Sequence, residues 1–444
     1  MSALEAARDH YLGQLAALRT SLGEGPAWLA ALREEARETF AAEGFPHPRL
    51  EEWRYTNLAG LAKLRLELAP PGPARVSEAE LEGLAFPLFA CSNTTFVDGR
   101  FAPELSVPRT LAGELRVESL AELRARAPER LEPHLGRVAS LKQHPFASLN
   151  TAFLDDGAAL VVPPGATAVQ PAHVVFLASR EGVQHPRVLL VAGAGSRVSL
   201  IQDHVSLPAA AGFTNSLTEV LAGPGAQVDL VLVQREGAGN FHVSNLQVRQ
   251  ERDSRVAVHT LSLGGRLVRN DAVAVLADEG AELALRGLFV GGGSQLVDNH
   301  TLVDHAMPRG TSRELYKGIL GGRARGVFRG RVVVRPDAQR TDAWQSNPNV
   351  LLSDGAEVDS KPQLEIYADD VRCSHGSSIG RLDDDALFYL RTRGIAEPAA
   401  REILTLGFAA EILLALPAPA LGEALSELLG ERLRGLSADP EGAA

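Results

Sequence analysis

The sequence is poor in cysteine and in aromatic residues, and it has no long apolar run. Its 444 residues include only two cysteines, Cys91 and Cys373, too few for the disulfide framework of a small secreted domain. No stretch of about 18 uninterrupted apolar residues occurs, so we expect no membrane-spanning helix. The opening residues, MSALEAARDHYLG, lack the basic and apolar parts of a signal peptide. These absences predict a cytoplasmic protein without a membrane partner.

Positive charge is also scarce. The chain has 44 Lys and Arg against 55 Asp and Glu, a net charge of −11, and no basic block interrupts this surplus of acids. An acidic surface repels phosphate backbones, so nucleic acid is not expected as a partner. The composition, 45% hydrophobic and 22% charged, is otherwise typical of a globular protein. At this length two or three domains are expected.

Several motifs of nucleotide, metal and acyl chemistry are missing. No G-x-x-x-x-G-K-[ST] occurs, so the chain is expected to bind no nucleotide of its own. There is no C-x-x-C pair, which excludes an iron–sulfur cluster held by four local thiolates. A G-x-S-x-G nucleophile elbow is also missing. The sequence therefore predicts no catalytic residue and no enzyme.

A short pattern recurs from about residue 157 onward: a small turn residue, polar residues, then Val or Leu. It begins at Gly195, Gly225, Asp253 and Gly280, with a looser copy one step earlier at Gly165. A fixed period of about 27–30 residues is typical of stacked structural repeats.

The segments between these turns alternate apolar and polar residues and are rich in Val and Leu, as in VDLVLVQR (228–235) and SRVAVHTLSL (254–263). This alternation favours strands over helices. A β-propeller would need four strands in every 40–45 residues or so, which is longer than the observed period. We therefore predict a mainly β protein with a parallel β-helix over residues 150–381.

Helical patterns flank this core. Residues 1–43 have apolar residues at helical spacing in two segments, and 1–149 is expected to be a mostly helical N-terminal region. After Asp383 the helical signal returns, and 382–444 is expected to be a C-terminal helical domain. This domain carries eleven acids and five arginines, more than half of the net charge of the chain.

Cys373 and His375 are the best candidates for metal ligands. They lie two residues apart, so on a strand they share one face, and thiolate and imidazole both bind iron. Two ligands are too few for a stable site, so others would come from elsewhere, such as a second chain. The alternative is a buried thiol beside a hydrogen-bonded histidine. Cys91 is interpreted as a small apolar residue, and His300 and His305 as ordinary polar residues on opposite faces of a strand.

A long C-terminal segment points to a family. SKPQLEIYADDVRCSHGSSIGRLDDDALFYLRTRGI, residues 360–395, is strongly similar to the SufB/SufD family of iron–sulfur cluster assembly proteins. Within this family the chain resembles the SufD branch, because Gly376 follows His375 where SufB has a glutamate. Weaker similarity covers EEWRYTNL (51–58), SLNTAFLDDGAALVVP (148–163), DNHTLVDHAMP (298–308) and TDAWQSNPNVLLSDGAEVDSKP (341–362).

The resemblance implies a right-handed parallel β-helix between helical end regions, which agrees with the repeat found independently. It also implies pairing with a SufB-type paralogue and docking of a SufC-type ABC ATPase on the C-terminal helices. A transient iron–sulfur cluster would then assemble at the interface of the two paralogues, shared with the partner chain. The resemblance places His375 at this site, and Cys373 ranks second. A homodimer remains open.

Two other functions are compatible with a β-helix. A β-helix polysaccharide lyase or hydrolase needs acids on one face of the solenoid, often with Ca²⁺, and Asp271, Asp298 and Asp304 are the candidates. Such enzymes are usually exported, and no export signal is present. A purely structural, self-assembling solenoid is the third hypothesis.

Overall fold

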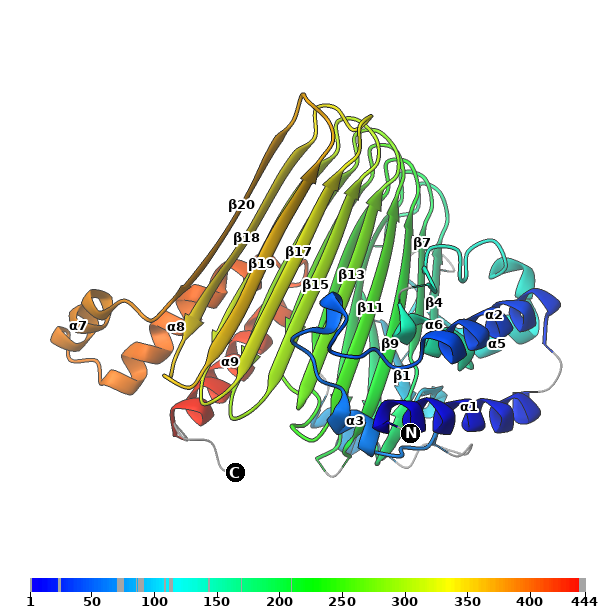
Figure 1. Cartoon of the computed structure of the whole chain (residues 1–444), viewed down its shortest axis with the longest axis horizontal. Coiled ribbons are helices and arrows are strands. Elements are labelled where there is room, and N and C mark those ends of the chain that lie inside the picture. Colours follow the sequence, from blue (N-terminus) through cyan, green and yellow to red (C-terminus); the bar gives the residue numbers. More distant parts are fainter. Residues whose placement is uncertain are drawn as a thin grey trace.

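The chain folds as a parallel β-solenoid in which successive strands alternate between two facing sheets (Figure 1). Helices flank the solenoid at both ends of the chain, which confirms the predicted fold class. The structure is a computed structural model. It describes residues 2–22, 25–69, 76–84, 86, 92–107, 109–111, 115–142, 144–168, 170–208 and 210–438.

The two sheets stack the coils in sequence order, and most pairs of neighbouring strands are parallel. In spatial order, the first sheet contains β2 (Arg100–Phe101), β1 (Ser92–Val97), β5 (Ala172–Ala178), β8 (Arg197–Ser206), β10 (Gln227–Gln234), β12 (Arg255–Ser262), β14 (Glu282–Gly291), β16 (Thr311–Leu320), β18 (Asp342–Leu351) and β20 (Arg372–Gly380). The second contains β19 (Glu357–Ile366), β17 (Arg325–Val334), β15 (Leu296–His305), β13 (Leu267–Leu276), β11 (Phe241–Gln250), β9 (Gly212–Ala222), β7 (Arg187–Ala192), β4 (Ala158–Val162) and β3 (Glu118–Ser119), with β6 (Gly182–Gln184) beside β9.

The recurring pattern marks one corner of each coil. Gly195 and Gly225 have φ values near +65°, a conformation that glycine adopts without steric cost. Asp253 takes the same place with φ +54°, which aspartate tolerates better than most residues. The residues that follow pair in register from coil to coil, for example Gln227 with Arg255. The repeat inferred from the sequence is therefore the structural coil.

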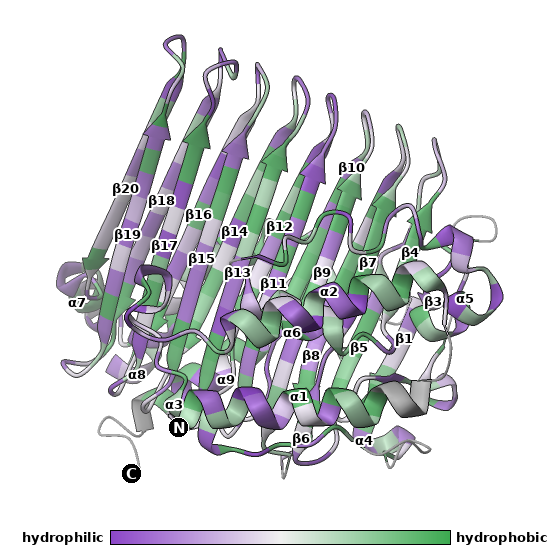
Figure 2. Ribbon diagram, turned by 45° about the vertical axis from the view of Figure 1, so that its right-hand side comes forward, coloured by the Kyte–Doolittle hydropathy of each residue, from purple (hydrophilic) through white to green (hydrophobic). Residues whose placement is uncertain are grey.

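Most of the space between the sheets is filled by apolar residues, and helices cover much of both outer faces. Figure 2 shows hydrophobic and hydrophilic bands alternating along many of the strands. The outer face of the second sheet packs against N-terminal helices through residues such as Tyr11, Phe40 and Phe213. The helices before the solenoid are α1 (Ala3–Leu22), α2 (Ala27–Glu43), η1 (Glu51–Trp53), α3 (Ala59–Lys63), α4 (Glu78–Glu82), η2 (Pro103–Leu105), α5 (Leu120–Arg126), η3 (Pro128–Arg130) and α6 (Pro145–Ala152).

The N-terminal part also contributes strands. β1 pairs in parallel with β5, so the first sheet begins before residue 150. The division into 1–149, 150–381 and 382–444 stays a prediction. None of the helices in the described residues is long and apolar enough to cross a membrane.

The C-terminal helices are α7 (Asp384–Thr392), α8 (Glu397–Leu413) and α9 (Pro419–Ala438). Helices α8 and α9 lie along the outer face of the first sheet, where Ile412 and Leu425 share one apolar cluster with Val231 and Ile319. They therefore form part of the core of the protein and do not close the end of the solenoid.

This packing gives a stability prediction. Deleting residues 396–444 is expected to leave an apolar sheet face in water, and contiguous apolar patches of this kind cause aggregation. The truncated chain should be insoluble or elute as an aggregate in size-exclusion chromatography. A control chain that ends at Ala438 should elute as the full chain does. A soluble, folded truncation would contradict the expectation.

Candidate functional site at the open end of the solenoid

The last coil of the solenoid is open. Strand β20 pairs only with β18, and β19 only with β17, so within the described residues each sheet ends in an edge strand. Most of β20 is exposed, and β19 is exposed or half-buried throughout. Figure 1 shows these two strands at the end of the solenoid nearest α7. An edge strand presents unpaired N–H and C=O groups, so this end can pair with another chain.

Cys373 and His375 both lie on the edge strand β20. Cys373 packs against the apolar cluster between the two sheets, so its side chain faces the interior of the solenoid. His375 is two residues further on and faces the same way. The predicted shared face is therefore present. Because no further coil follows, the His375 side chain is exposed at the open end.

The Cys373 thiol is half-buried. Its burial raises its pKa, and nearby Asp342 acts in the same direction, while a hydrogen bond with the backbone of Ala343 lowers it. The thiol thus keeps its proton in this chain alone, and a metal ion would have to displace it. Within the described ranges, no group of three or more His, Cys, Asp or Glu could hold a metal ion. Cys91 lies outside the described residues.

Sequence reasoning missed two polar residues inside the solenoid near this end. Glu314 in β16 is 1% exposed, and Gln345 in β18 is fully buried. They are 31 residues apart in sequence, yet Gln345 Nε2 donates a hydrogen bond of 2.5 Å to Glu314 Oε2. No local motif marks such a pair, because only the coil register brings the two residues together.

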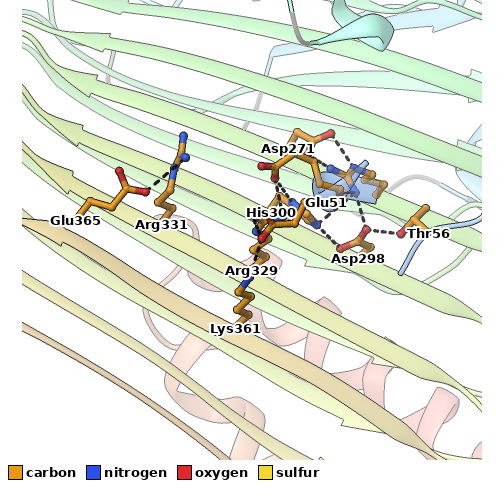
Figure 3. A network of polar contacts seen from close by, with 11 residues as sticks. Glu51, Thr56, Asp271, Asp298, His300, Arg329, Arg331, Lys361 and Glu365 are labelled. Carbon is orange, nitrogen blue, oxygen red and sulfur yellow. Dashed lines mark hydrogen bonds and ion pairs between the residues drawn. The ribbon is translucent and has the colours of Figure 1, made fainter. Parts of the chain in front are cut away.

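A second polar cluster lies on the outer face of the second sheet, under the segment EEWRYTNL (Figure 3). Asp298 is 1% exposed there and accepts hydrogen bonds from Thr56 and from Arg269, the latter at 2.7 Å. The Arg269 guanidinium lies 3.7 Å from the centre of the Trp53 ring. Burial alone would raise the pKa of Asp298, but the charges of His300 and Arg269 hold it well below its usual range.

The same cluster reaches the last strand of the second sheet. Glu51 accepts a hydrogen bond of 3.1 Å from Arg329 and one of 2.8 Å from Lys361 in β19. A cleft beside this cluster is lined by residues that include Arg331 and His144. Most charges around it are paired within the chain, so the cluster holds the N-terminal segment against the coils.

The acids proposed for a carbohydrate-cleaving site are engaged with arginines. Asp271 and Asp298 both pair with Arg269, and Asp304 pairs with Arg335. Each of these three acids is therefore held in an ion pair. His300 and His305 face opposite sides of β15, as predicted: His300 faces Asp298 outside, and His305 contacts Ser312 inside at 2.9 Å.

An exposed apolar surface lies on α7 and α8. Phe388 and Tyr389 are 68% and 57% exposed, Ile403 is 47% exposed, and Leu414, just after α8, is 85% exposed. Asp383 is the N-cap of α7 and accepts hydrogen bonds from the backbone N–H groups of two residues in its first turn. Phe388 and Tyr389 are neighbours on α7, which packs against α8, and large exposed apolar side chains of this kind mark a surface for protein contacts.

Comparison with known proteins gives the same family over almost the whole chain. The family model "SUF system FeS cluster assembly, SufBD core domain" matches residues 175–408, and "SufBD protein N-terminal region" matches residues 8–174. A SufBD family protein of Synechocystis is 31% identical over 88% of both chains. The iron–sulfur cluster assembly protein SufD of Escherichia coli is 30% identical over 88% of this chain and 90% of its own. SufD of Bacillus subtilis is 26% identical over 92% of this chain and 95% of its own.

Proposed function

Because the chain belongs to the SufBD family of iron–sulfur cluster assembly proteins, we propose that it is a non-catalytic scaffold subunit of such an assembly complex. It pairs with a SufB-type paralogue through the open end of the solenoid. It docks a SufC-type ABC ATPase on its C-terminal helices, and it shares a transient iron–sulfur cluster with the paralogue. One observation carries this proposal: the edge strand β20 presents His375 and Cys373 where a second chain can reach them.

The open end supports pairing with a similar chain. A second solenoid end offers edge strands of the same spacing, so the two sheets can continue across the interface by backbone hydrogen bonds. Ile366 and Ile379, 40% and 50% exposed at this end, would be buried by such a partner. A paralogue richer in cysteine would also supply the thiolates that this chain lacks. A second copy of this chain would fit the strands but would add few thiolates.

The helical surface supports docking of a separate ATPase. The sequence contains no P-loop, so energy from ATP would have to come from a partner. Phe388 and Tyr389 on α7, with Ile403 on α8, offer an exposed apolar surface beyond the part of α8 and α9 that the solenoid buries. Exposed aromatic side chains of this kind are frequent anchors at protein interfaces.

Co-purification tests the partners. We expect the wild-type chain to co-purify with both the SufB-type and the SufC-type homologue from the same cell. Replacing Phe388 and Tyr389 together with aspartate should remove the ATPase and keep the paralogue, because two charges would enter an apolar contact. Met307→Asp, also at an exposed apolar residue but in a turn of the solenoid, is the matched control and should keep both.

Retention of the ATPase by the Phe388→Asp, Tyr389→Asp chain would place the docking surface elsewhere. A wild-type chain that purifies only as a homodimer, even when both homologues are co-expressed, would contradict the proposed scaffold.

A further inference from the structure

One row of interior side chains leads from the buried part of the solenoid to its open end. The coil register places Leu285 next to Glu314, Glu314 next to Gln345, and Gln345 next to His375. The row is apolar at Leu285 and polar in the last three coils. It ends on the residue that the proposed function makes a ligand of the shared cluster.

The first contact in this row is built to hold the Gln345 amide. Gln345 Nε2 donates to Glu314 Oε2 at 2.5 Å, and both side chains are buried. The facing strand makes room for the amide, because a side chain at Gly330 would place its Cβ 2.1 Å from Gln345 Nε2. No larger residue than glycine fits there while Gln345 keeps this position.

The other side of the amide has a free acceptor. Gln345 Oε1 is buried and has no hydrogen-bond partner. The neighbouring interior amides differ, since Asn347 Oδ1 accepts from Asn349 at 2.9 Å and from Ser360 at 2.7 Å. Strand β18 lies between β16, which carries Glu314, and β20, which carries His375. With its nitrogen committed to Glu314, the amide has His375 as its next neighbour in the row.

We propose that Gln345 is a positioning residue for His375, and that Glu314 holds Gln345 in the orientation this role requires. The free carbonyl oxygen of Gln345 accepts the N–H of the His375 imidazole. The other ring nitrogen then carries its lone pair toward the open end, where the cluster is shared. This inference rests on the proposed function, which makes His375 a ligand.

The chemistry follows from the donors and acceptors of the three groups. A neutral imidazole has one N–H donor and one acceptor nitrogen, so an acceptor on one side selects the tautomer. Metal-binding histidines usually donate their second nitrogen to such a partner. Above pH 7 the ionised Glu314 can only accept, so it forces Gln345 to present its N–H inward and its oxygen outward. Burial raises the pKa of Glu314 to about 7, while the hydrogen bond from Gln345 opposes the shift.

The test uses two measurements on the full chain. Nitrogen-15 NMR of labelled histidine, with His375 assigned by loss of its signals in His375→Gln, reports the tautomer. We expect one dominant tautomer in the wild type and a mixture in Gln345→Met, which keeps the length of the side chain and loses the acceptor. In the complex with its partners, Gln345→Met should form clusters about tenfold more slowly, the lower range for losing a partner of a metal ligand.

Two further variants separate positioning from folding. Glu314→Gln keeps an acceptor for the Gln345 amide and should retain the wild-type tautomer, whereas Glu314→Leu should lose it. Gln247→Met removes another buried glutamine, far from the open end, and should change neither measurement. An unchanged tautomer in both Gln345→Met and Glu314→Leu would overturn the inference. If the tautomer changes but His375→Ala complexes form clusters normally, Gln345 positions the histidine, and the part of the proposed function that makes His375 a cluster ligand is wrong.

Discussion

Replacing His375 with alanine is expected to leave folding and assembly with the partners intact and to lower cluster formation in cells by tenfold or more. His375 is exposed on an edge strand, so no packed core depends on its side chain. An imidazole at a shared cluster cannot be replaced by water without weakening the metal site. The measurement is the activity of an iron–sulfur enzyme in cells whose only copy of this chain carries the variant. Co-purified partners serve as the control for assembly.

Cys373→Ser should have a smaller effect. Burial raises the pKa of this thiol, and its side chain packs against the core, which is consistent with a structural role. Ser377→Ala, next on the same face of β20, is the matched control and should be neutral. Normal cluster formation with His375→Ala would show that this histidine is not a ligand. A larger defect with Cys373→Ser than with His375→Ala would reverse the order of the two residues.

Much of the fold could be predicted because each coil of the solenoid needs particular residues at its corners and along its strands. Residues such as Gly195 and Gly225 occupy corners with positive φ, and few residues can replace glycine there. Alternation along each strand then predicts which residues share a face. Cys373 and His375 could be paired in this way without any structure.

Alternation does not say which face is inside. Both faces of most strands are buried here, because the inner faces pack against the opposite sheet and helices cover much of the outer faces. Polar residues such as Glu314 and Gln345 are therefore indistinguishable in sequence from those on an outer face. The position of α8 and α9 could not be predicted either, since Leu-rich helices after a solenoid can close its end or lie along its side.

Contacts between segments far apart in the sequence could not be predicted either. The segment EEWRYTNL and the segment DNHTLVDHAMP could each be recognised by resemblance, but their contact could not. Thr56 and Asp298 lie 242 residues apart and meet only because the N-terminal segment crosses the outer face of β15. The ion pairs of Glu51 extend this contact to Lys361 in β19, so the N-terminal segment braces the coils nearest the open end.

Acid is expected to unfold the protein between about pH 6 and pH 4, well before most carboxylates are protonated. Burial lowers the pKa values of five histidines from 6.5 to about 3 or 4. In the unfolded chain they take up protons near pH 6.5, so the unfolded state binds more protons throughout this range. Their stabilisation is complete above pH 6.5 and is lost as the pH falls toward the folded values. The five are His173, His185, His204, His259 and His305.

The loss of folding free energy on acidification is as large as the whole folding free energy of a typical domain. Lowering a histidine pKa from 6.5 to 4 or 3 corresponds to roughly 3–5 kcal/mol, so five histidines together cost on the order of 15 kcal/mol at pH 4. Net folding free energies are about 5–15 kcal/mol. Glu314 acts in the opposite direction. Because its pKa is raised, the free energy of unfolding increases by about 3 kcal/mol as the pH falls from 7 to 4.5. The histidines outnumber it, so the net change is destabilising.

Urea unfolding at a series of pH values between 8 and 4.5 measures this dependence. His259→Gln should be less stable than the wild type at pH 8, because a packed ring is lost, but its stability should fall less steeply with acid. One fewer buried imidazole removes about one proton from the difference between the two states. His47→Gln, at an exposed histidine, is the matched control and should keep the wild-type slope. Equal slopes for His259→Gln and the wild type would mean that the buried imidazoles do not set the acid limit, and that protonation of carboxylates such as Asp298, whose folded pKa is depressed, does so at lower pH.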